Sequence, residues 1–549
     1  MLAFCFTFIF FGPLEMVAFG GDSFFYNYTD VLPFLTVTAV IVFVVLALVI
    51  ALLRGKIYNY VICVISAVTV CGYIQAALMN GSLGTLTGET VDWAAHRGQM
   101  LWGLAVWAAV LILFLFIMYL NRKVWRTATG IIAGLLVVMQ LAPTIAIFSG
   151  AYADVKVDEL SDYFLSEDGL TEYSKNDNTF VFVLDYTDYD YIEQVLKKQP
   201  DFFDKLDGFT GYTDAISVFG RTQPALNNLL TGCVDLPYNV PAKQFYTESW
   251  TQNGKNFLEA LTDNNYDINL YANHRYLFGD AEFAKKYVSN LHYIKEGIEY
   301  SEVSLVSKLL SLSVYRYAPT AIKPFFWADT NYYNDGVYKE TDVTRYILND
   351  SKYGEMFKSG TAENDKNCFK LYHLFGAHPP YTLNADGTRS GAPTDEPTQT
   401  MGVFNNLYKA FDKMKELGIY DNATIIITAD HGNAEKMVDE QLIPTRIALF
   451  YKPSKSAKEP FKWSDAQVSS SNIAATVLKA AGAEYKDYGT PLDEIESGKN
   501  ITRVFYRTVL KNAGWTDTAV QRYEVTGSSR DVSNWKLTGT TDVKYKFYG

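Results

Sequence analysis

Residues 424–433 read TIIITADHGN, an apolar run that ends in a group of polar residues. An unbroken run of β-favouring residues is typical of a strand that is buried on both faces of a sheet. The run stops at Asp430 and His431, and Gly432 follows them. Because ligands in open α/β sheets bind beyond the carboxyl ends of the strands, this polar end predicts a functional site.

Similar runs recur along the chain and alternate with helical patterns. They read TFVFVLD (179–185), YDINLYA (266–272), CFKLYHL (368–374) and RIALFYK (446–452). This alternation predicts an α/β domain over 179–490, with a central, mostly parallel sheet covered by helices. The polar segment 151–178 is predicted to be a linker with short helices, and 491–549 a small antiparallel C-terminal subdomain.

Polar residues at the other strand ends are further candidates for this site. Asp185 closes its strand, although a helical pattern starts there and a helix N-cap is the alternative. Asp430 and His431 offer a carboxylate and an imidazole, which suit Mn²⁺ or Zn²⁺. His378 lies in a loop rich in Gly and Pro, where its ring either faces a cleft or lies on the surface. His373 lies inside its strand and is expected to be a core histidine with satisfied hydrogen bonds.

Thr222 stands out in the stretch GRTQPALNNLLTG (220–232). With Pro224 in the following turn, it fits a helix N-cap. A helix N-terminus also offers free N–H groups and a positive dipole end to a phosphate group. A threonine hydroxyl there could lose its proton to become a nucleophile if a metal coordinates it, so the cap and the nucleophile are compatible roles.

The N-terminal part of the chain differs strongly from the rest. Residues 1–150 hold six Lys and Arg and five Asp and Glu, which leaves 42 basic and 55 acidic residues for the remainder. An acidic soluble region argues against nucleic acid as a partner. Five apolar stretches have about the 20 residues needed to cross a bilayer. They are about 2–20, 33–53, 57–79, 100–120 and 127–148.

The first of these stretches is the weakest span, because Gly12, Pro13 and Glu15 interrupt it. A signal peptide is the alternative, but no basic region precedes it. Basic residues gather in the loops between the second and third and between the fourth and fifth stretches. These residues are Arg54, Lys56, Arg122, Lys123 and Arg126. The positive-inside rule then predicts a cytoplasmic N-terminus and an extracellular region after Tyr152, which requires an odd number of spans.

Two of the five cysteines, Cys233 and Cys368, lie in the predicted external domain. They could form a disulfide or remain isolated buried thiols, and the sequence leaves both alternatives open.

Together these motifs resemble the sulfatase-like branch of the alkaline phosphatase superfamily. The order is similar: a strand ending in Asp185, a nucleophile at a helix start and a late Asp-His-Gly. The stretch 222–232 keeps the family's Pro, its Leu-Leu-Thr-Gly and their spacing, but Thr222 replaces Cys or Ser and Leu226 replaces Arg. A threonine cannot become formylglycine, so the chain is more similar to lipoteichoic acid synthases and phosphoethanolamine transferases. Lipoteichoic acid synthases also have five spans before an extracellular catalytic domain.

Two more segments carry the resemblance. The stretch AHPPY (377–381) resembles the family's His-x-Pro segment, which contacts the substrate phosphate. The stretch SNIAATVLKAAG (471–482) resembles a late family helix, although Asn472 and Ala475 replace its Asp and Pro.

The resemblance implies a site with one divalent metal ion, Mn²⁺ or Zn²⁺, with Mg²⁺ or Ca²⁺ as alternatives. Its ligands would be Asp185, Thr222, Asp430 and His431. Lipoteichoic acid synthases have Glu at the first of these positions, and Tyr186 stands where sulfatases have a second Asp. Arg221 or His378 would stabilise the charge of the phosphoryl group.

The activity implied is transfer of a phospho-alcohol group from a phospholipid to an envelope glycan or polymer, with Thr222 as nucleophile. A hydrolase with water as acceptor is the first alternative. Sulfate-ester hydrolysis is disfavoured by Thr222 and Leu226. A non-catalytic membrane sensor that keeps the fold belongs to a different class, and retention of the four metal ligands argues against it.

Overall fold

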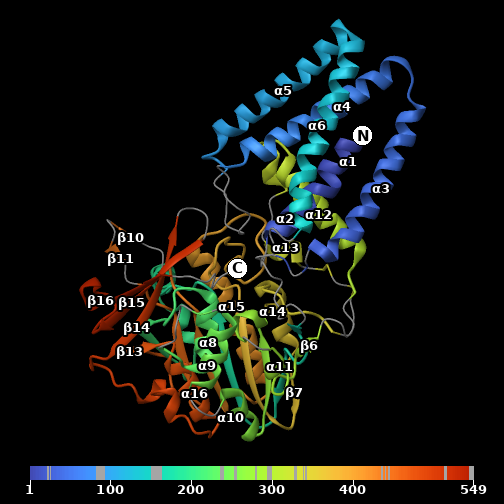
Figure 1. Cartoon of the computed structure of the whole chain (residues 1–549). Coiled ribbons are helices and arrows are strands. Elements are labelled where there is room, and N and C mark those ends of the chain that lie inside the picture. The colour runs from blue at the N-terminus through green and yellow to red at the C-terminus, as the bar shows by residue number, and fades with distance from the viewer. Residues whose placement is uncertain are drawn as a thin grey trace. The chain divides into compact units, whose positions relative to one another are not determined.

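A seven-stranded sheet, in the order β13-β4-β12-β9-β3-β8-β5, forms the centre of the soluble region in the computed structural model (Figure 1). Its strands are β3 (Asn178–Leu184), β4 (Thr210–Ile216), β5 (Tyr266–Tyr271), β8 (Asn367–Leu374), β9 (Ala423–Thr428), β12 (Leu449–Lys452) and β13 (Lys462–Ser469). All neighbours pair in parallel except β12, which is antiparallel to both β4 and β9. The predicted mostly parallel sheet is therefore confirmed.

The chain forms two compact units. One comprises Met1–Asp158, Ile298–Thr341 and Gly549, and the other Glu159–Gly297 and Asp342–Tyr548. The structure describes every residue except 21–23, 25, 27, 82–92, 150–162, 235–239, 241, 253–255, 279–280, 294–298, 327–329, 335, 338, 340–342, 434–436, 439–440, 443–444, 512–515 and 543–549.

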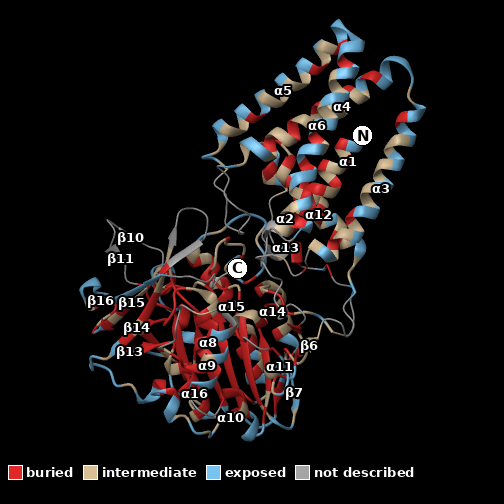
Figure 2. Ribbon diagram, in the orientation of Figure 1, coloured by how far each residue is buried: buried red, intermediate tan, exposed pale blue. Residues whose placement is uncertain are grey.

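Helices cover both faces of the sheet, which explains the unbroken apolar strands. In β3, Val181 and Val183 pack with the helices α8 (Thr222–Thr231), α10 (Phe257–Asp263) and α16 (Asn472–Ala480). The alternate residues of β3 face α7 (Tyr189–Lys198) and α15 (Glu396–Glu416) on the other side. Every residue of β3 and β9 is buried, and Figure 2 shows buried strands at the centre of this unit.

The strand β12, formed within the apolar run 446–452, is the antiparallel exception in the mostly parallel sheet that was predicted. Leu449 and Phe450 enter the cores on opposite faces of the sheet, and both are fully buried. Burial on both faces produces an apolar run whatever the direction of the strand, so the run carries no information about direction.

The C-terminal region forms an antiparallel sheet, as predicted. Its strands are β14 (Thr502–Lys511), β15 (Thr516–Thr526) and β16 (Trp535–Asp542). Arg503 of β14 reaches Asp214 of β4 through a buried ion pair of 3.0 Å. This pair ties the C-terminal sheet to the central one.

The segment 151–178 differs from the prediction of a linker with short helices. Its first twelve residues lie outside the described chain, and the rest holds two strands, β1 (Tyr163–Leu165) and β2 (Glu172–Ser174). β1 pairs with β6 (Leu291–Tyr293), and β2 pairs with β7 (Thr361–Asn364). Tyr173 is fully buried, so this part belongs to the core of the soluble unit.

Among the described residues of the N-terminal unit, four helices are long and apolar enough to cross a membrane. They are α3 (Tyr28–Leu52), α4 continued by η3 (Gly55–Met79), α5 (Arg97–Leu120) and α6 (Arg122–Phe148). Long stretches of α3 and α5 are exposed in Figure 2, as lipid-facing helices require. Four of the five predicted apolar helices are thus confirmed by length and composition.

The first apolar stretch forms a shorter helix, Leu2–Ala18. It runs through α1 (Leu2–Cys5), η1 (Phe6–Phe11) and the start of α2 (Gly12–Gly20), and it contacts α3, α4 and α6. Thr7 and Leu14 are fully buried on it. The helix therefore packs inside the group of longer helices, and its role as a fifth span stays a prediction.

A segment from the middle of the sequence also belongs to the N-terminal unit. The helix α12 (Glu302–Tyr317) packs on α2, α3, α4 and the π-helical turns η1 and η3 (Gln75–Met79). No local pattern in residues 302–317 indicates that a segment between two parts of the soluble unit returns to the apolar helices.

Candidate metal and nucleophile site

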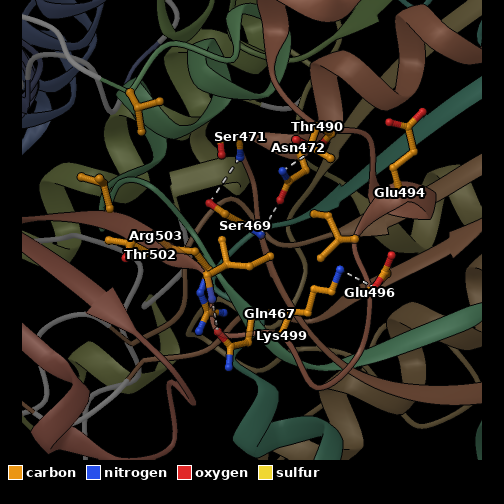
Figure 3. Close-up of a pocket in the computed structure, with 14 residues that line it drawn as sticks. Gln467, Ser469, Ser471, Asn472, Thr490, Glu494, Glu496, Lys499, Thr502 and Arg503 are labelled. Atoms are coloured by element: carbon orange, nitrogen blue, oxygen red, sulfur yellow. Dashed lines mark hydrogen bonds and ion pairs between the residues drawn. The ribbon is translucent and has the colours of Figure 1, made fainter.

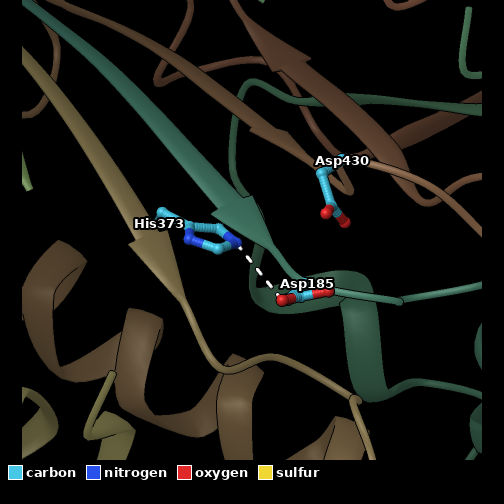
Figure 4. A group of neighbouring side chains, drawn as sticks. All are labelled: Asp185, His373 and Asp430. Atoms are coloured by element: carbon cyan, nitrogen blue, oxygen red, sulfur yellow. Dashed lines mark ion pairs between the residues drawn. The ribbon is translucent and has the colours of Figure 1, made fainter. Parts of the chain in front are cut away.

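Three buried side chains meet at the carboxyl ends of β3, β8 and β9 (Figure 4). Asp185 follows β3, His373 lies near the end of β8, and Asp430 follows β9 by two residues. Each holds one possible ligand atom within 4.8 Å of the others. The alternation of side chains along the strands explains why these three residues lie close together. Val183, Leu371 and Ile426 of the same strands belong to the core cluster on the α8 side of the sheet. Asp185, His373 and Asp430 lie two, two and four positions further along and therefore face the same side.

The carboxylates of this group are not satisfied by the protein. Asp430 is fully buried, and its Oδ1 accepts hydrogen bonds from the backbone N–H groups of Tyr186 (3.0 Å) and His431 (2.7 Å). Its Oδ2 and Asp185 Oδ1 have no hydrogen-bond partner among the residues that the structure describes. Buried polar atoms are almost always paired, so these two oxygens need an explanation.

His431 presents its ring to the same place. Its Nδ1 donates a hydrogen bond to the carbonyl of Gly432 at 2.8 Å. In the neutral ring, Nε2 is then unprotonated and its lone pair can bind a metal ion or accept a hydrogen bond. That Nε2 lies 3.5 Å from Asp430 Oδ2 and 4.0 Å from Asp185 Oδ1. It also lies 3.3 Å from Thr222 Oγ1. The structure therefore brings together the four residues predicted to be metal ligands.

Thr222 lies at the first position of α8, and Arg221 occupies the N-cap position before it. The expectation that Thr222 caps the helix is wrong by one residue, and its hydroxyl contacts His431 instead of a backbone N–H. Its backbone still lies in the first turn, where N–H groups lack carbonyl partners within the helix. The half-buried Arg221 directly precedes the hydroxyl in the chain.

The alternative reading of Asp185 as a helix cap is also settled. Asp188 is the N-cap of α7, and its Oδ1 accepts from Asp190 N at 2.9 Å. Asp185 lies before this turn and is 6% exposed. The side chain of Asp185 therefore does not cap α7 and belongs to the group with His373 and Asp430.

Two glycines allow the loops around the site to approach closely. A Cβ on Gly432 would lie 2.7 Å from both Asp188 Oδ2 and Arg446 O. A Cβ on Gly376, which has a φ of 63°, would collide with the backbone of Asp185. Asp350 holds this second loop, because its carboxylate accepts from Phe375 N at 2.7 Å and Gly376 N at 2.9 Å.

His378 lies beside the site, and the Tyr186 ring contacts the rings of both His378 and His431. His378 Nδ1 donates to the carbonyl of Pro379, and the His378 ring lies 5.4 Å from that of Tyr186. The Tyr186 ring also lies 5.4 Å from that of His431. Tyr186 has a φ of 57°, which is uncommon for a non-glycine residue and concentrates at functional sites.

The two carboxyl groups titrate differently. Burial raises the pKa of Asp185, but nearby imidazoles, with His373 foremost, outweigh it, and the pKa lies below its ordinary value. Burial and the neighbouring Asp185 raise the pKa of Asp430. Two carboxylates at close range resist being ionised together, and a cation between them removes that conflict.

His373 was expected to be a satisfied core histidine, and only its burial is as expected. It is 1% exposed, and neither ring nitrogen has a hydrogen-bond partner among the described residues. Its Nε2 lies 3.4 Å from Asp185 Oδ2, an ion-pair distance outside hydrogen-bond geometry. The parallel register, which places His373 opposite Val183, was the signal that it shares a face with Asp185.

The residues at this site fit a divalent cation. They supply two unsatisfied carboxylate oxygens, the His431 Nε2 lone pair that faces the Thr222 hydroxyl, and that hydroxyl itself. Oxygen and nitrogen ligands of this kind suit Mn²⁺, Zn²⁺ or Mg²⁺.

Other features lie away from this group. A cavity of about 310 Å³ opens between the start of α16 and residues 490–504 (Figure 3), and none of the predicted site residues lines it. Asn472, which departs from the family pattern, is there engaged structurally: it accepts from Ser469 N and donates to Thr490 O. Cys233 and Cys368 are both free and buried, so the disulfide alternative is excluded.

Comparisons with known proteins yield similarity only to solved structures. No family model matches the chain, and no curated protein matches it. Ps i-CgsB in complex with k-i-k-neocarrahexaose is 15% identical, covering 66% of this chain and 86% of that chain, with a TM-score of 0.41. The phosphonate monoester hydrolase of Silicibacter pomeroyi is 14% identical (67% and 89%, TM-score 0.37).

A third structure is a protein in the alkaline phosphatase superfamily from Vibrio parahaemolyticus. It is 12% identical, covering 67% of this chain and 79% of that chain, with a TM-score of 0.36. Identities this low and TM-scores below 0.5 do not establish a family for the chain.

Proposed function

We propose that this chain is a membrane-anchored, metal-dependent phosphotransferase that uses Thr222 as its nucleophile. The observation that carries the proposal is the contact of 3.3 Å between Thr222 Oγ1 and His431 Nε2, beside two buried carboxylate oxygens without partners. This hydroxyl belongs to the first residue of a helix and lies next to the candidate cation site. The resemblance of residues 222–232 to the nucleophile segment of sulfatase-like proteins supports the same role.

Asp185, Asp430, His431 and Thr222 would hold one divalent cation. Such an ion would lower the pKa of the threonine hydroxyl and polarise a phosphoryl oxygen of the substrate. The backbone N–H groups at the start of α8 would bind the phosphoryl group. Arg221 and His378 are proposed to stabilise its negative charge.

The reaction would proceed in two exchanges. Thr222 Oγ1 attacks the phosphorus of a phospholipid, the bond to the lipid alcohol breaks, and that alcohol takes up the proton lost by the threonine. A phosphothreonine diester results. A hydroxyl of a glycan or polymer then attacks the same phosphorus and loses its proton, which returns to Thr222 as the leaving group.

Mass spectrometry of the peptide that contains Thr222 tests this proposal directly. The full chain, reconstituted with Mn²⁺ in vesicles of phosphatidylglycerol and phosphatidylethanolamine, should gain the mass of glycerol phosphate or phosphoethanolamine at Thr222. Thr222→Val, which keeps the shape but lacks the hydroxyl, should gain nothing. Thr247→Val, at an exposed threonine of α9 (Ala242–Thr251), is the control and should behave like wild type. An unmodified Thr222 under turnover would overturn the proposal.

A hydrolase shares the first exchange and differs only in the acceptor. Release of free glycerol phosphate from labelled phosphatidylglycerol, with no labelled polymer when acceptor is supplied, would favour it. A non-catalytic sensor predicts neither the adduct nor any release, and Thr222→Val would then change nothing.

We further propose that the N-terminus lies in the cytoplasm and that residues after Tyr152 lie outside. The distribution of basic residues between the loops supports this orientation. A cysteine introduced at Asp531, which is exposed, should then react with a membrane-impermeant thiol reagent on intact cells.

A further inference from the structure

The segment around α12 is held firmly against the apolar N-terminal helices. Leu305 and Leu309 are fully buried in a cluster with Leu14, Val31 and other residues of α2 and α3. These contacts lie within one compact unit, although α12 is separated from α2 by almost 300 positions of sequence. α12 is therefore a component of the membrane region and not a surface helix of the soluble domain.

Polar ties fix the C-terminal half of α12 and the turn after it. Arg316 pairs with Glu15 of α2 at 2.7 Å, and Asn80 Nδ2 donates to Arg316 O at 2.8 Å. Gln75 of η3 donates to Thr320 Oγ1 at 3.3 Å. The pairing also explains how Glu15 is accommodated in an otherwise apolar helix, since its charge has a partner.

The opposite side of α12 carries apolar residues, of which Val303 and Val314 are exposed and Leu310 is half-buried. Val303, Leu310 and Val314 recur at helical spacing, and Val303 is 84% exposed. The turn that follows, with η8 (Lys323–Phe325), adds Ile322 and Phe325, which is also 84% exposed. Exposed large apolar side chains gathered on one segment mark a binding surface.

The cations of this turn are already engaged. Lys323 is buried, and its Nζ donates to the carbonyls of Tyr315 and Arg316. Arg316 is paired with Glu15. The exposed side of the turn therefore presents apolar side chains, while its charged groups are engaged in contacts within the protein.

We propose that residues 302–326 form a bilayer-contacting element of this protein, in which Phe325 and Ile322 insert between lipids. The occupant follows from the packing: helices long and apolar enough to span a membrane are surrounded by lipid, and α12 lies directly on two of them, α3 and α4. Interfacial segments of this kind bury their apolar side chains about 5–10 Å into the boundary between headgroups and acyl chains. This inference does not depend on the proposed transferase activity.

Quenching of a fluorophore by lipids tests the proposal. All five native cysteines are free and buried, so a polarity-sensitive dye on Phe325→Cys reports this position alone. The full chain is reconstituted in vesicles of phosphatidylcholine and phosphatidylglycerol that contain lipids with a nitroxide near the headgroup. Val532→Cys, in the soluble unit and 42% exposed, is the matched control.

We expect the dye at position 325 to be quenched by the nitroxide lipids several-fold more than the dye at 532, and less by aqueous iodide. Equal quenching at both positions would overturn the proposal. Protection from iodide without quenching by lipid would also overturn it, and would point to a second copy of the chain as the occupant. Ile322→Cys provides an independent position if Phe325→Cys does not fold.

Discussion

Two groups of buried carboxylates in the same domain differ in how they are satisfied. Asp214 of β4 is 5% exposed, and both of its carboxylate oxygens accept hydrogen bonds, from Arg503 Nη1 at 3.0 Å and from Ser529 N at 3.1 and 3.2 Å. Asp185 and Asp430 are equally buried, yet each keeps an oxygen without a partner among the described residues. Both oxygens of Asp214 are satisfied within the protein, although Arg503 Nε has no partner among the described residues. In the second group it is the carboxylates themselves that each keep an unpartnered oxygen.

We expect this difference to separate a charge that stabilises the fold from a charge that serves the proposed function. Burying an ionised group is costly unless it is paired, so the Asp214 group is expected to stabilise the fold only while both partners remain. The Asp185 group is expected to lower the free energy of unfolding when no cation is bound, and to be retained because the proposed activity needs it.

The largest effect is expected on activity when a carboxylate of the site is removed. Asp430→Asn should lower phosphotransfer by roughly 10³-fold or more, because metal binding and hydroxyl activation are lost together. Its thermal stability without metal should equal or exceed that of wild type, since a repulsive pair is removed. Activity assays and thermal unfolding measured on the same preparation check both parts. A large loss of stability would mean that this group is structural after all.

Breaking the ion pair between Arg503 and Asp214 should have the opposite effect, a large loss of stability. Arg503→Met leaves Asp214 buried without its cation and should lower the free energy of unfolding of the domain by about 3–5 kcal/mol. The control is Arg522→Met, which breaks an ion pair with Glu524 in which both side chains are about one third exposed and should cost less than about 1 kcal/mol. Denaturant titrations compare the two variants, and similar losses would remove the distinction between them.

Metal linkage tests the Asp185 group without any mutation. Adding Mn²⁺ or Zn²⁺ at about 100 times the dissociation constant should stabilise wild type by about 2.7 kcal/mol, and a chelator should reverse the gain. Asp430→Asn should show little of this shift, and Arg503→Met should keep it. A shift retained in full by Asp430→Asn would locate the metal elsewhere.

A third type of buried charge sharpens the comparison by its dependence on pH. Lys370 of β8 is buried, and among the described residues its Nζ donates only to neutral oxygens, those of Gly169 (2.7 Å) and Asn269 (2.8 Å). Burial lowers its pKa to about 8. The unfolded chain then binds more protons than the folded one between about pH 8 and the ordinary lysine value of 10.5. Stability should therefore rise with pH across this window, by at most about 1.4 kcal/mol per pH unit.

The matched variant for this measurement is Lys370→Met, which has a similar length and no charge. The difference in unfolding free energy between wild type and this variant should become more favourable to wild type as the pH rises. A flat difference would show that Lys370 keeps its ordinary pKa in the folded protein.

The sequence predicted the parts of the fold that depend on local pattern. The runs at 179–185, 266–272 and 424–430 became strands because β-favouring residues buried on both faces are distinctive. The same logic placed Asp185, Asp430 and His431 at strand ends, and the structure brings them together with Thr222.

What the sequence did not reveal depends on pairing between distant segments. The direction of β12 follows from its neighbours, and its apolar residues are the same for either direction. His373 resembled a core residue because only the register between β3 and β8 places it beside Asp185. The return of α12 to the membrane helices depends on contacts such as that between Arg316 and Glu15, which no local pattern predicts.

The insertion of α12 also affects how the soluble unit can be released. The chain passes from one unit to the other after Asp158, after Gly297 and again after Thr341. A single proteolytic cut near residue 158 would leave the soluble unit tethered by two further connections, so its release from the N-terminal unit requires at least one more cut on each side of α12. A fragment that begins at residue 163 would carry α12 without its apolar partners, with Leu305 and Leu309 newly exposed, and should aggregate unless residues 298–341 are replaced by a short polar loop.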